Sequence, residues 1–179
     1  NSENIGDLIE NSDCFFNLDI FSLDIDGIDY WIINELPENF AKIVVLEYNP
    51  LFGSNLEVTV PNLPDFDRSS YHYSNLCFGM SLKAAINLML KKNFYFIGTN
   101  LFKNNAFFVN KKFLKEKYFN NLQVKSIEDS VNSNFTESRS KGGLLNYLNK
   151  KNRIKEIQDC DVINLANLGS EKKKIKDLL

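Results

Sequence analysis

The sequence lacks long hydrophobic runs, has one histidine among 179 residues, and carries no excess of charge of one sign. No apolar segment approaches the roughly 18 residues that a membrane span requires. Residues 1–11 are too polar for a secretory signal peptide. The formal net charge of −2 argues against nucleic-acid binding, which a strongly basic surface favours. We therefore expect neither a membrane nor a nucleic acid among the partners of this protein.

Cysteine is also scarce, and its spacing excludes the common metal motifs. Cys14, Cys77 and Cys160 are odd in number, lie far apart and form no Cys-x-x-Cys pair. Widely spaced free thiols are typical of a reducing compartment, so the expected location is the cytoplasm.

The single histidine, His72, stands between Tyr71 and Tyr73. A lone loop histidine is more often a surface residue than a catalytic base. The tyrosines have two open roles, which are to line an acceptor pocket or to cover a sheet edge. We take Tyr71 and His72 as candidate substrate-binding residues.

Hydrophobic periodicity and helix-stop signals predict an α/β fold with an antiparallel sheet edge. Strands are expected at about 16–23, 41–48, 94–99 and 106–109, and helices within 1–13, at about 28–36 and at 82–90. The short connector between the last two strands lets them pair as an antiparallel hairpin. The Pro- and Asn-rich segment 51–79 is expected to be an irregular loop, and loops of this length usually carry function or move. Residues 111–179 have weak helical periodicity and are predicted to form an appended, largely helical arm.

Carboxylates gather where the first two predicted strands end. Asp24, Asp26 and Asp29 follow the first strand, while Glu47 and Asn49 end the second. Ligands of open α/β sheets bind outside the carboxyl ends of strands, so Asp24 and Asp26 are candidate catalytic residues, and Glu47 and Asn49 are candidate substrate-binding residues. The structural alternative is that Asp26 caps the following helix and Asp29 lies in its first turn.

Asp24, Asp26 and Glu47 also offer hard oxygen ligands for Mg²⁺. A calcium loop counted from Asp24 fails, because its sixth position is Asp29 rather than glycine. Asp24-Ile25-Asp26-Gly27 is similar to the first motif of haloacid-dehalogenase-type phosphotransferases, which would make Asp24 a nucleophile and Asp26 an acid/base. Ile28 replaces the threonine of that motif.

Three blocks of the chain resemble FkbM-type, class I S-adenosylmethionine-dependent methyltransferases. They are the acidic segment Leu23–Tyr30, the strand Lys42–Pro50 and the hairpin Phe94–Val109, and together they cover about residues 16–110. The resemblance implies that residues 1–110 form part of a Rossmann-like methyltransferase sheet. It also implies methyl transfer from S-adenosylmethionine to a small-molecule or glycan acceptor, with Asp24 positioning or deprotonating that acceptor.

The resemblance begins at the fourth strand of that family, because no Gly-x-Gly turn precedes Asp24. We therefore expect the main cofactor-binding residues upstream of this chain. The strand at 16–23 would then be an exposed sheet edge, able to pair with a second copy in a homodimer. A non-catalytic domain that binds a partner through the loop 51–79 remains the third hypothesis.

Overall fold

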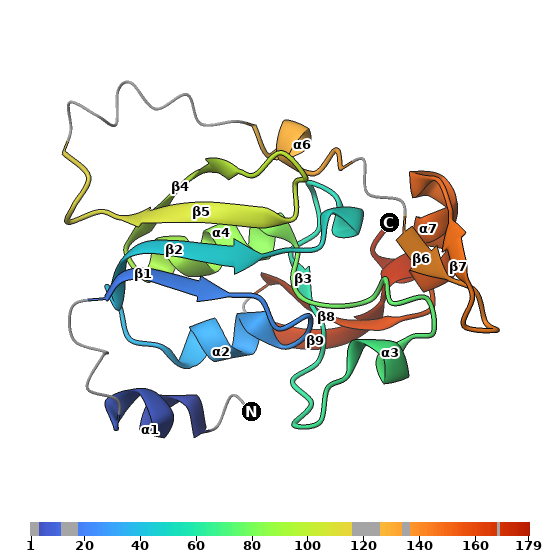
Figure 1. Ribbon diagram of the computed structural model, residues 1–179, viewed down its shortest axis with the longest axis horizontal. Helices are drawn as coiled ribbons and strands as arrows, with labels where there is room; N and C mark the ends of the chain where they lie inside the picture. The colour runs from blue at the N-terminus through green and yellow to red at the C-terminus, as the bar shows by residue number, and fades with distance from the viewer. Residues whose placement is uncertain (1–3, 12–17, 116–125, 134–136, 168) are drawn as a thin grey trace.

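The central feature is a mixed four-stranded sheet in the order β1-β2-β5-β4 (Figure 1). The computed structural model describes residues 4–11, 18–115, 126–133, 137–167 and 169–179. β1 (Leu18–Leu23) runs parallel to β2 (Ala41–Glu47). β5 (Asn105–Asn110) is antiparallel to both β2 and β4 (Phe94–Thr99). The predicted α/β class and the predicted antiparallel hairpin are confirmed.

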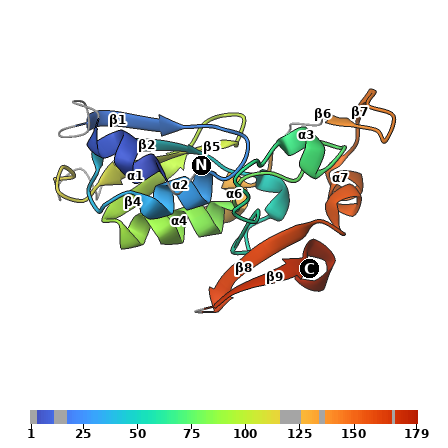
Figure 2. The ribbon, with the colours of Figure 1, turned by 90° about the horizontal axis from the view of Figure 1, so that it is seen from below.

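Three helices, α1 (Ile5–Glu10), α2 (Asp29–Glu35) and α4 (Leu82–Lys91), lie on one face of this sheet (Figure 2). The predicted start of α4 is confirmed, because the Ser81 hydroxyl accepts a hydrogen bond from the Ala84 amide at 3.1 Å. The apolar faces of α2 and α4 bury Ile33, Leu88 and Met89, among others, against the sheet. None of the described helices is long and apolar enough to span a membrane.

A second layer joins the middle of the chain to its C-terminal part. β3 (Val58–Thr59) pairs with β8 (Asp161–Asn167), which pairs with β9 (Gly169–Lys174), and both pairings are antiparallel. Helix α7 (Lys150–Ile157) lies beside this sheet. The shared core of this layer buries Ile28, Val58, Val60, Leu76, Ile157, Val162 and Ile175. Side chains from the segment 51–79 and from residues 154–178 of the arm therefore share one hydrophobic cluster.

The prediction of a helical C-terminal arm is wrong for residues 161–174, which form β8 and β9. Val162 is fully buried, and Asp161 forms ion pairs with Lys172 at 2.8 Å and Lys174 at 3.3 Å on the neighbouring strand. Strand propensity depends strongly on such cross-strand partners, so the lysine-rich sequence of β9 does not reveal it. The arm also contains the β6–β7 hairpin (Glu137–Arg139 and Leu145–Tyr147).

The remaining elements are short turns of helix. They are η2 (Pro50–Phe52), α3 (Arg68–Tyr71), α6 (Ile127–Ser130) and η3 (Ile175–Asp177). η3 lies close to the C-terminus, and its residue Ile175 is buried in the second core.

β1 is an edge strand, as predicted. Its residue Ile20 is 62% exposed and lies in register with the partly exposed Ile43 of β2. Residues 16 and 17 of the predicted strand lie outside the described residues. Pairing of this edge in a homodimer stays a prediction.

Candidate functional site

Carboxylate oxygens of Asp24, Asp26 and Glu47 lie within 4.8 Å of one another at one edge of the main sheet. Asp24 and Asp26 follow the last residue of β1, and Glu47 is the last residue of β2. The two strands are parallel and in register, so their carboxyl ends meet at the same edge. We call these three residues the acidic triad.

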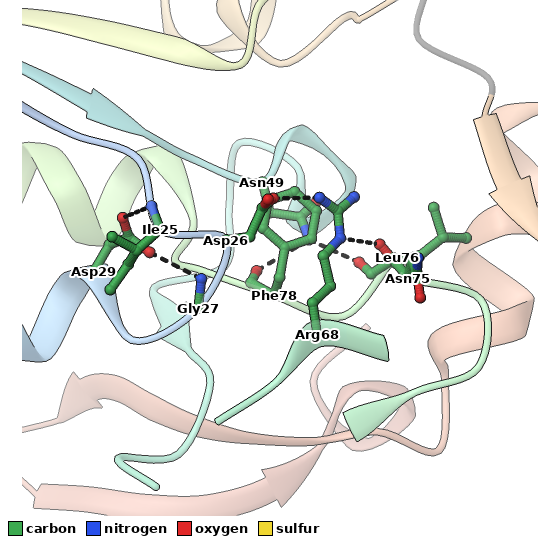
Figure 3. A network of polar contacts seen from close by, with 9 residues as sticks. All are labelled: Ile25, Asp26, Gly27, Asp29, Asn49, Arg68, Asn75, Leu76 and Phe78. Atoms are coloured by element: carbon green, nitrogen blue, oxygen red, sulfur yellow. Dashed lines mark hydrogen bonds and ion pairs between the residues drawn. The ribbon is translucent and has the colours of Figure 1, made fainter. Parts of the chain in front are cut away.

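Asp29 builds the turn that presents the acidic triad. Its side chain is fully buried and accepts hydrogen bonds from the backbone amides of Ile25 (3.1 Å) and Gly27 (3.0 Å) (Figure 3). A Cβ atom at Gly27 would stand 2.8 Å from the ring of Phe66, so only glycine fits there without a shift. Asp26 has a φ of 55°, in the left-handed region that aspartate adopts more readily than most residues.

The capping role considered for Asp26 is wrong. Helix α2 has Ile28 at its N-cap with no side-chain cap bond, while Asp29 lies in the first turn as expected. The carboxylate of Asp26 instead forms an ion pair with the guanidinium of Arg68. The Asp26 carboxylate therefore interacts with Arg68 and not with the N-terminus of the helix.

Arg68 is held in place by three different contacts (Figure 3). Its Nη1 pairs with Asp26, and its Nε donates to the Asn75 carbonyl at 2.6 Å. The guanidinium also lies 3.8 Å from the centroid of the Phe78 ring. Such stacking orients a guanidinium while leaving part of its positive charge available.

The pKa values of two members of the acidic triad, Glu47 and Asp24, are raised. Glu47 is only 8% exposed, and burial together with the charges of Asp24 and Asp26 raises its pKa to about 8. The pKa of Asp24 is raised by its partial burial and by Asp26. The Oε2 atom of Glu47 is buried and has no hydrogen-bond partner among the described residues. A proton or a cation is needed to compensate this buried carboxylate.

The acidic triad fits a divalent metal ion. Its ligands are carboxylate oxygens, which Mg²⁺ and Ca²⁺ prefer, and one of them, Glu47 Oε2, lacks any other partner in the described structure. A bound cation would remove the mutual repulsion that raises the pKa of Glu47.

A cavity of about 430 Å³ adjoins the acidic triad through Glu47. Its wall is formed by Glu47, Asn49, Pro50, Leu51, Arg68, Leu76, Phe78, Asn100, Phe102, Asn104, Asn105, Ser133 and Arg153. The volume is in the range of small-molecule sites, and the wall contains both apolar and polar side chains.

Asn49 has a structural task in this wall. Its Nδ2 donates to the carbonyls of Leu76 (2.8 Å) and Phe78 (3.2 Å), and its Oδ1 accepts from the Leu51 amide (3.1 Å). The side chain therefore ties the end of β2 to the segment that carries Phe78. That network holds the cavity open beside Glu47.

Tyr71 and His72 are not among the residues that line this cavity. The Tyr71 hydroxyl donates to the Asp161 carbonyl at 2.6 Å, and His72 Nδ1 lies 2.7 Å from the Ser74 hydroxyl. Hydrogen bonds from Cys77 and His72 lower the pKa of the buried Cys160 thiol. These side chains belong to the second layer, whereas Asp24, Asp26, Glu47 and Asn49 come together as the strand ends suggested.

Sequence reasoning missed the two arginines of the cavity wall, Arg68 and Arg153. Arg68 comes from the segment expected to be irregular, and Arg153 comes from the appended arm. One signal was available: the chain has three arginines among its 21 basic residues, and two of the three line the cavity. Where lysine is the default cation, a rare arginine is a candidate for anion recognition.

Comparison of the chain with protein-family models, with curated proteins and with solved structures finds no match.

Proposed function

We propose that this chain forms the acceptor-side half of an S-adenosylmethionine-dependent methyltransferase. The observation that carries the proposal is the strand order, in which β5 is inserted antiparallel between β2 and β4 after two parallel strands. The resemblance of residues 16–110 to FkbM-type enzymes implies a sheet that ends in such a hairpin. The acidic turn and Glu47 lie at the strand ends where that fold binds its ligands.

Methyl transfer requires an acceptor oxygen or nitrogen held close to the sulfonium methyl group and relieved of its proton. Glu47 lines the cavity, and its pKa of about 8 suits a general base at neutral to mildly alkaline pH. Asp24 lies beside it and is positioned to share the abstracted proton. A divalent cation on the acidic triad would supply Lewis acidity that favours the deprotonated acceptor.

S-adenosylmethionine itself would be held mainly by residues outside this chain, because the described strands are not preceded by a glycine-rich turn. The test is calorimetric titration of S-adenosylhomocysteine into the product of the complete open reading frame and into this chain alone. We expect binding by the longer product and little or none by the chain alone. Failure of both to bind would refute the methyltransferase.

Turnover of the longer product tests the role of Asp24. Asp24→Asn should reduce methyl transfer by at least about 100-fold, because asparagine cannot share the proton that Glu47 abstracts. Asp19→Asn is the matched control, because Asp19 is an exposed carboxylate of β1, the strand that precedes Asp24, and it pairs with Lys42 at 2.5 Å. Equal rates for the two variants would remove Asp24 from the mechanism.

A second candidate is an aspartate-based phosphotransferase. The observation that favours it is Glu47, which adds to Asp24 and Asp26 the third carboxylate that the sequence motif alone lacks. Magnesium-dependent hydrolysis of p-nitrophenyl phosphate, lost in Asp24→Asn, would support it. That activity without S-adenosylhomocysteine binding would replace the methyltransferase as the conclusion.

A further inference from the structure

Arg153 is a buried cation without a counter-charge. Its side chain is 3% exposed, and it forms no ion pair with any carboxylate of the described residues. Its Nε is buried without a hydrogen-bond partner in the same part of the chain. Desolvation lowers the pKa of Arg153, with no nearby charge opposing it. An arginine nevertheless stays protonated in proteins, so the positive charge persists.

Such an arrangement is costly unless something pairs with the charge. Removing an ion from water costs several kcal/mol even after relaxation, and a fixed partner normally offsets that cost. The helix that carries Arg153 is well formed at its N-terminus, because the Asn149 side chain caps it by accepting a hydrogen bond from the Asn152 amide at 3.0 Å. At the C-terminal end of the same helix, Ile157 is fully buried. The burial of Arg153 is therefore a property of an ordered helix.

Arg153 lines the 430 Å³ cavity that Glu47 and Arg68 also line. Arg68 is not equivalent to it, because Nη1 and Nε of Arg68 already bind Asp26 and the Asn75 carbonyl. Asn100, Asn104 and Asn105 add amide groups to the same wall. The cavity thus offers one arginine fork with unused donors, a second positive charge nearby, and neutral hydrogen-bonding groups.

We propose that this cavity is an oxyanion-binding site, in which Arg153 pairs with a carboxylate or phosphate group of the ligand. A guanidinium fork recognises both groups through parallel hydrogen bonds. The proposal rests on the proposed function only in identifying that ligand as the methyl acceptor. It deepens that function by naming the acceptor class, an anionic small molecule whose charged end is held at Arg153 while its reacting end faces Glu47.

Titration calorimetry on the full chain tests the site with two probes, inorganic phosphate and malonate, each added to separate samples at constant ionic strength. We expect saturable binding of at least one probe, and the stronger of the two identifies the phosphate or carboxylate source. Arg153→Gln should weaken that binding at least tenfold. The matched control is Lys155→Gln, which removes an exposed positive charge from the same helix and should leave the affinity within twofold.

Arg153→Met keeps the experiment decisive if the glutamine variant folds poorly. Replacing an unpaired buried charge by an apolar side chain of similar length should raise the thermal midpoint of the free protein by a few degrees. The same variant should lose the stabilisation that the bound anion gives to the wild type. A lower midpoint together with unchanged anion stabilisation would identify Arg153 as a purely structural residue and overturn the proposal.

The remaining outcomes separate this site from the proposed function. Anion binding that depends on Arg153, in a longer product that does not bind S-adenosylhomocysteine, supports the site and refutes the methyltransferase. Binding of S-adenosylhomocysteine, with neither probe bound by the wild type, supports the methyltransferase and overturns the anion site. Equal binding of a probe by wild type and Arg153→Gln also overturns it.

Discussion

The acidic triad and Arg153 border the same cavity, yet the fold supports their charges in opposite ways. Beside the triad, Asp29 accepts two backbone amides and builds the turn, and within the triad Asp26 pairs with Arg68. Arg153 has no such partner among the described residues. The turn that carries Asp26 is thus stabilised by contacts within the fold, whereas Arg153 is available to pair with a ligand that enters the cavity.

The exception within the triad is Glu47, which resembles Arg153 more than it resembles Asp26. Both side chains are buried, both line the cavity, and each has one polar atom without a partner in the described structure. Buried polar atoms without partners lower the stability of the free protein, and such costs are common at binding sites, where a ligand can satisfy them. The comparison therefore distinguishes residues that build the site from residues that await a ligand.

The largest effect is expected from pH acting on Glu47. Its pKa of about 8 in the folded protein lies above the ordinary glutamate value, so the folded state binds the extra proton between about pH 4.5 and 8. Stability should therefore be highest below that interval, fall as pH rises across it and level off above about pH 8, with a total loss of up to about 5 kcal/mol. Urea unfolding at a series of pH values measures the decline.

Glu47→Gln should flatten this pH dependence, because glutamine does not titrate. Glu128→Gln, at an exposed position of α6, is the control and should leave the profile unchanged. If the free energy of unfolding of the wild type does not change between pH 5 and 8, the pKa of Glu47 is not raised. Glu47 would then be a carboxylate that the fold itself stabilises, like Asp26.

Asp29 should give the next largest effect, and it lies on the side of the comparison that builds the site. Asp29→Ala leaves the amides of Ile25 and Gly27 without their acceptor and should destabilise the chain by about 3 kcal/mol. Asp65→Ala, in an exposed loop position, should change stability by less than about 0.5 kcal/mol. Urea midpoints measured for both variants decide the matter, and equal midpoints would contradict the assignment.

The acidic triad could be predicted from the sequence because its residues lie at the ends of two strands that are recognisable from their own local sequence. The run from Asp24 to Asp29 joins a strand to a helix within a few residues, and Glu47 ends the next strand, so parallel pairing brings them together. The role of Asp29 was harder to foresee. Its place in the first turn of α2 was predicted, but its hydrogen bonds from the two preceding amides depend on the geometry of the turn.

The arginine wall could not be predicted, because its information is spread over the chain. Arg68 reaches Asp26 across 42 residues, and Arg153 enters through a layer in which β8 pairs with β3. That pairing depends on Val58 and Val162 meeting in one core, and no periodicity within either segment announces it. The C-terminal strands were missed for the same reason, since long-range contacts override weak local propensity.

Binding of a divalent cation should distinguish the acidic triad from Arg153 through a smaller effect on stability. Mg²⁺ at ten times its dissociation constant should stabilise the chain by about 1.4 kcal/mol, and EDTA should reverse this. Protons compete for Glu47, so the affinity for Mg²⁺ should rise as pH increases through about 8. Calorimetry at pH 6.5 and 8.5 checks the trend, with Arg153→Met expected to bind Mg²⁺ as the wild type does. Loss of Mg²⁺ binding in Arg153→Met would show that the acidic triad and Arg153 act as one site.

The smallest effect is expected at Arg68, the residue that touches both regions. Arg68→Lys keeps the positive charge but loses the Nε bond to Asn75 and the stacking on Phe78, which should cost about 1 kcal/mol of stability. If the role of Arg68 is to hold Asp26 of the acidic triad, as their ion pair indicates, Arg68→Lys should retain its affinity for phosphate or malonate within about threefold. A tenfold loss, equal to that of Arg153→Gln, would instead place both arginines on the ligand. The oxyanion would then be held between them, and Asp26 would have to release Arg68 when the ligand binds.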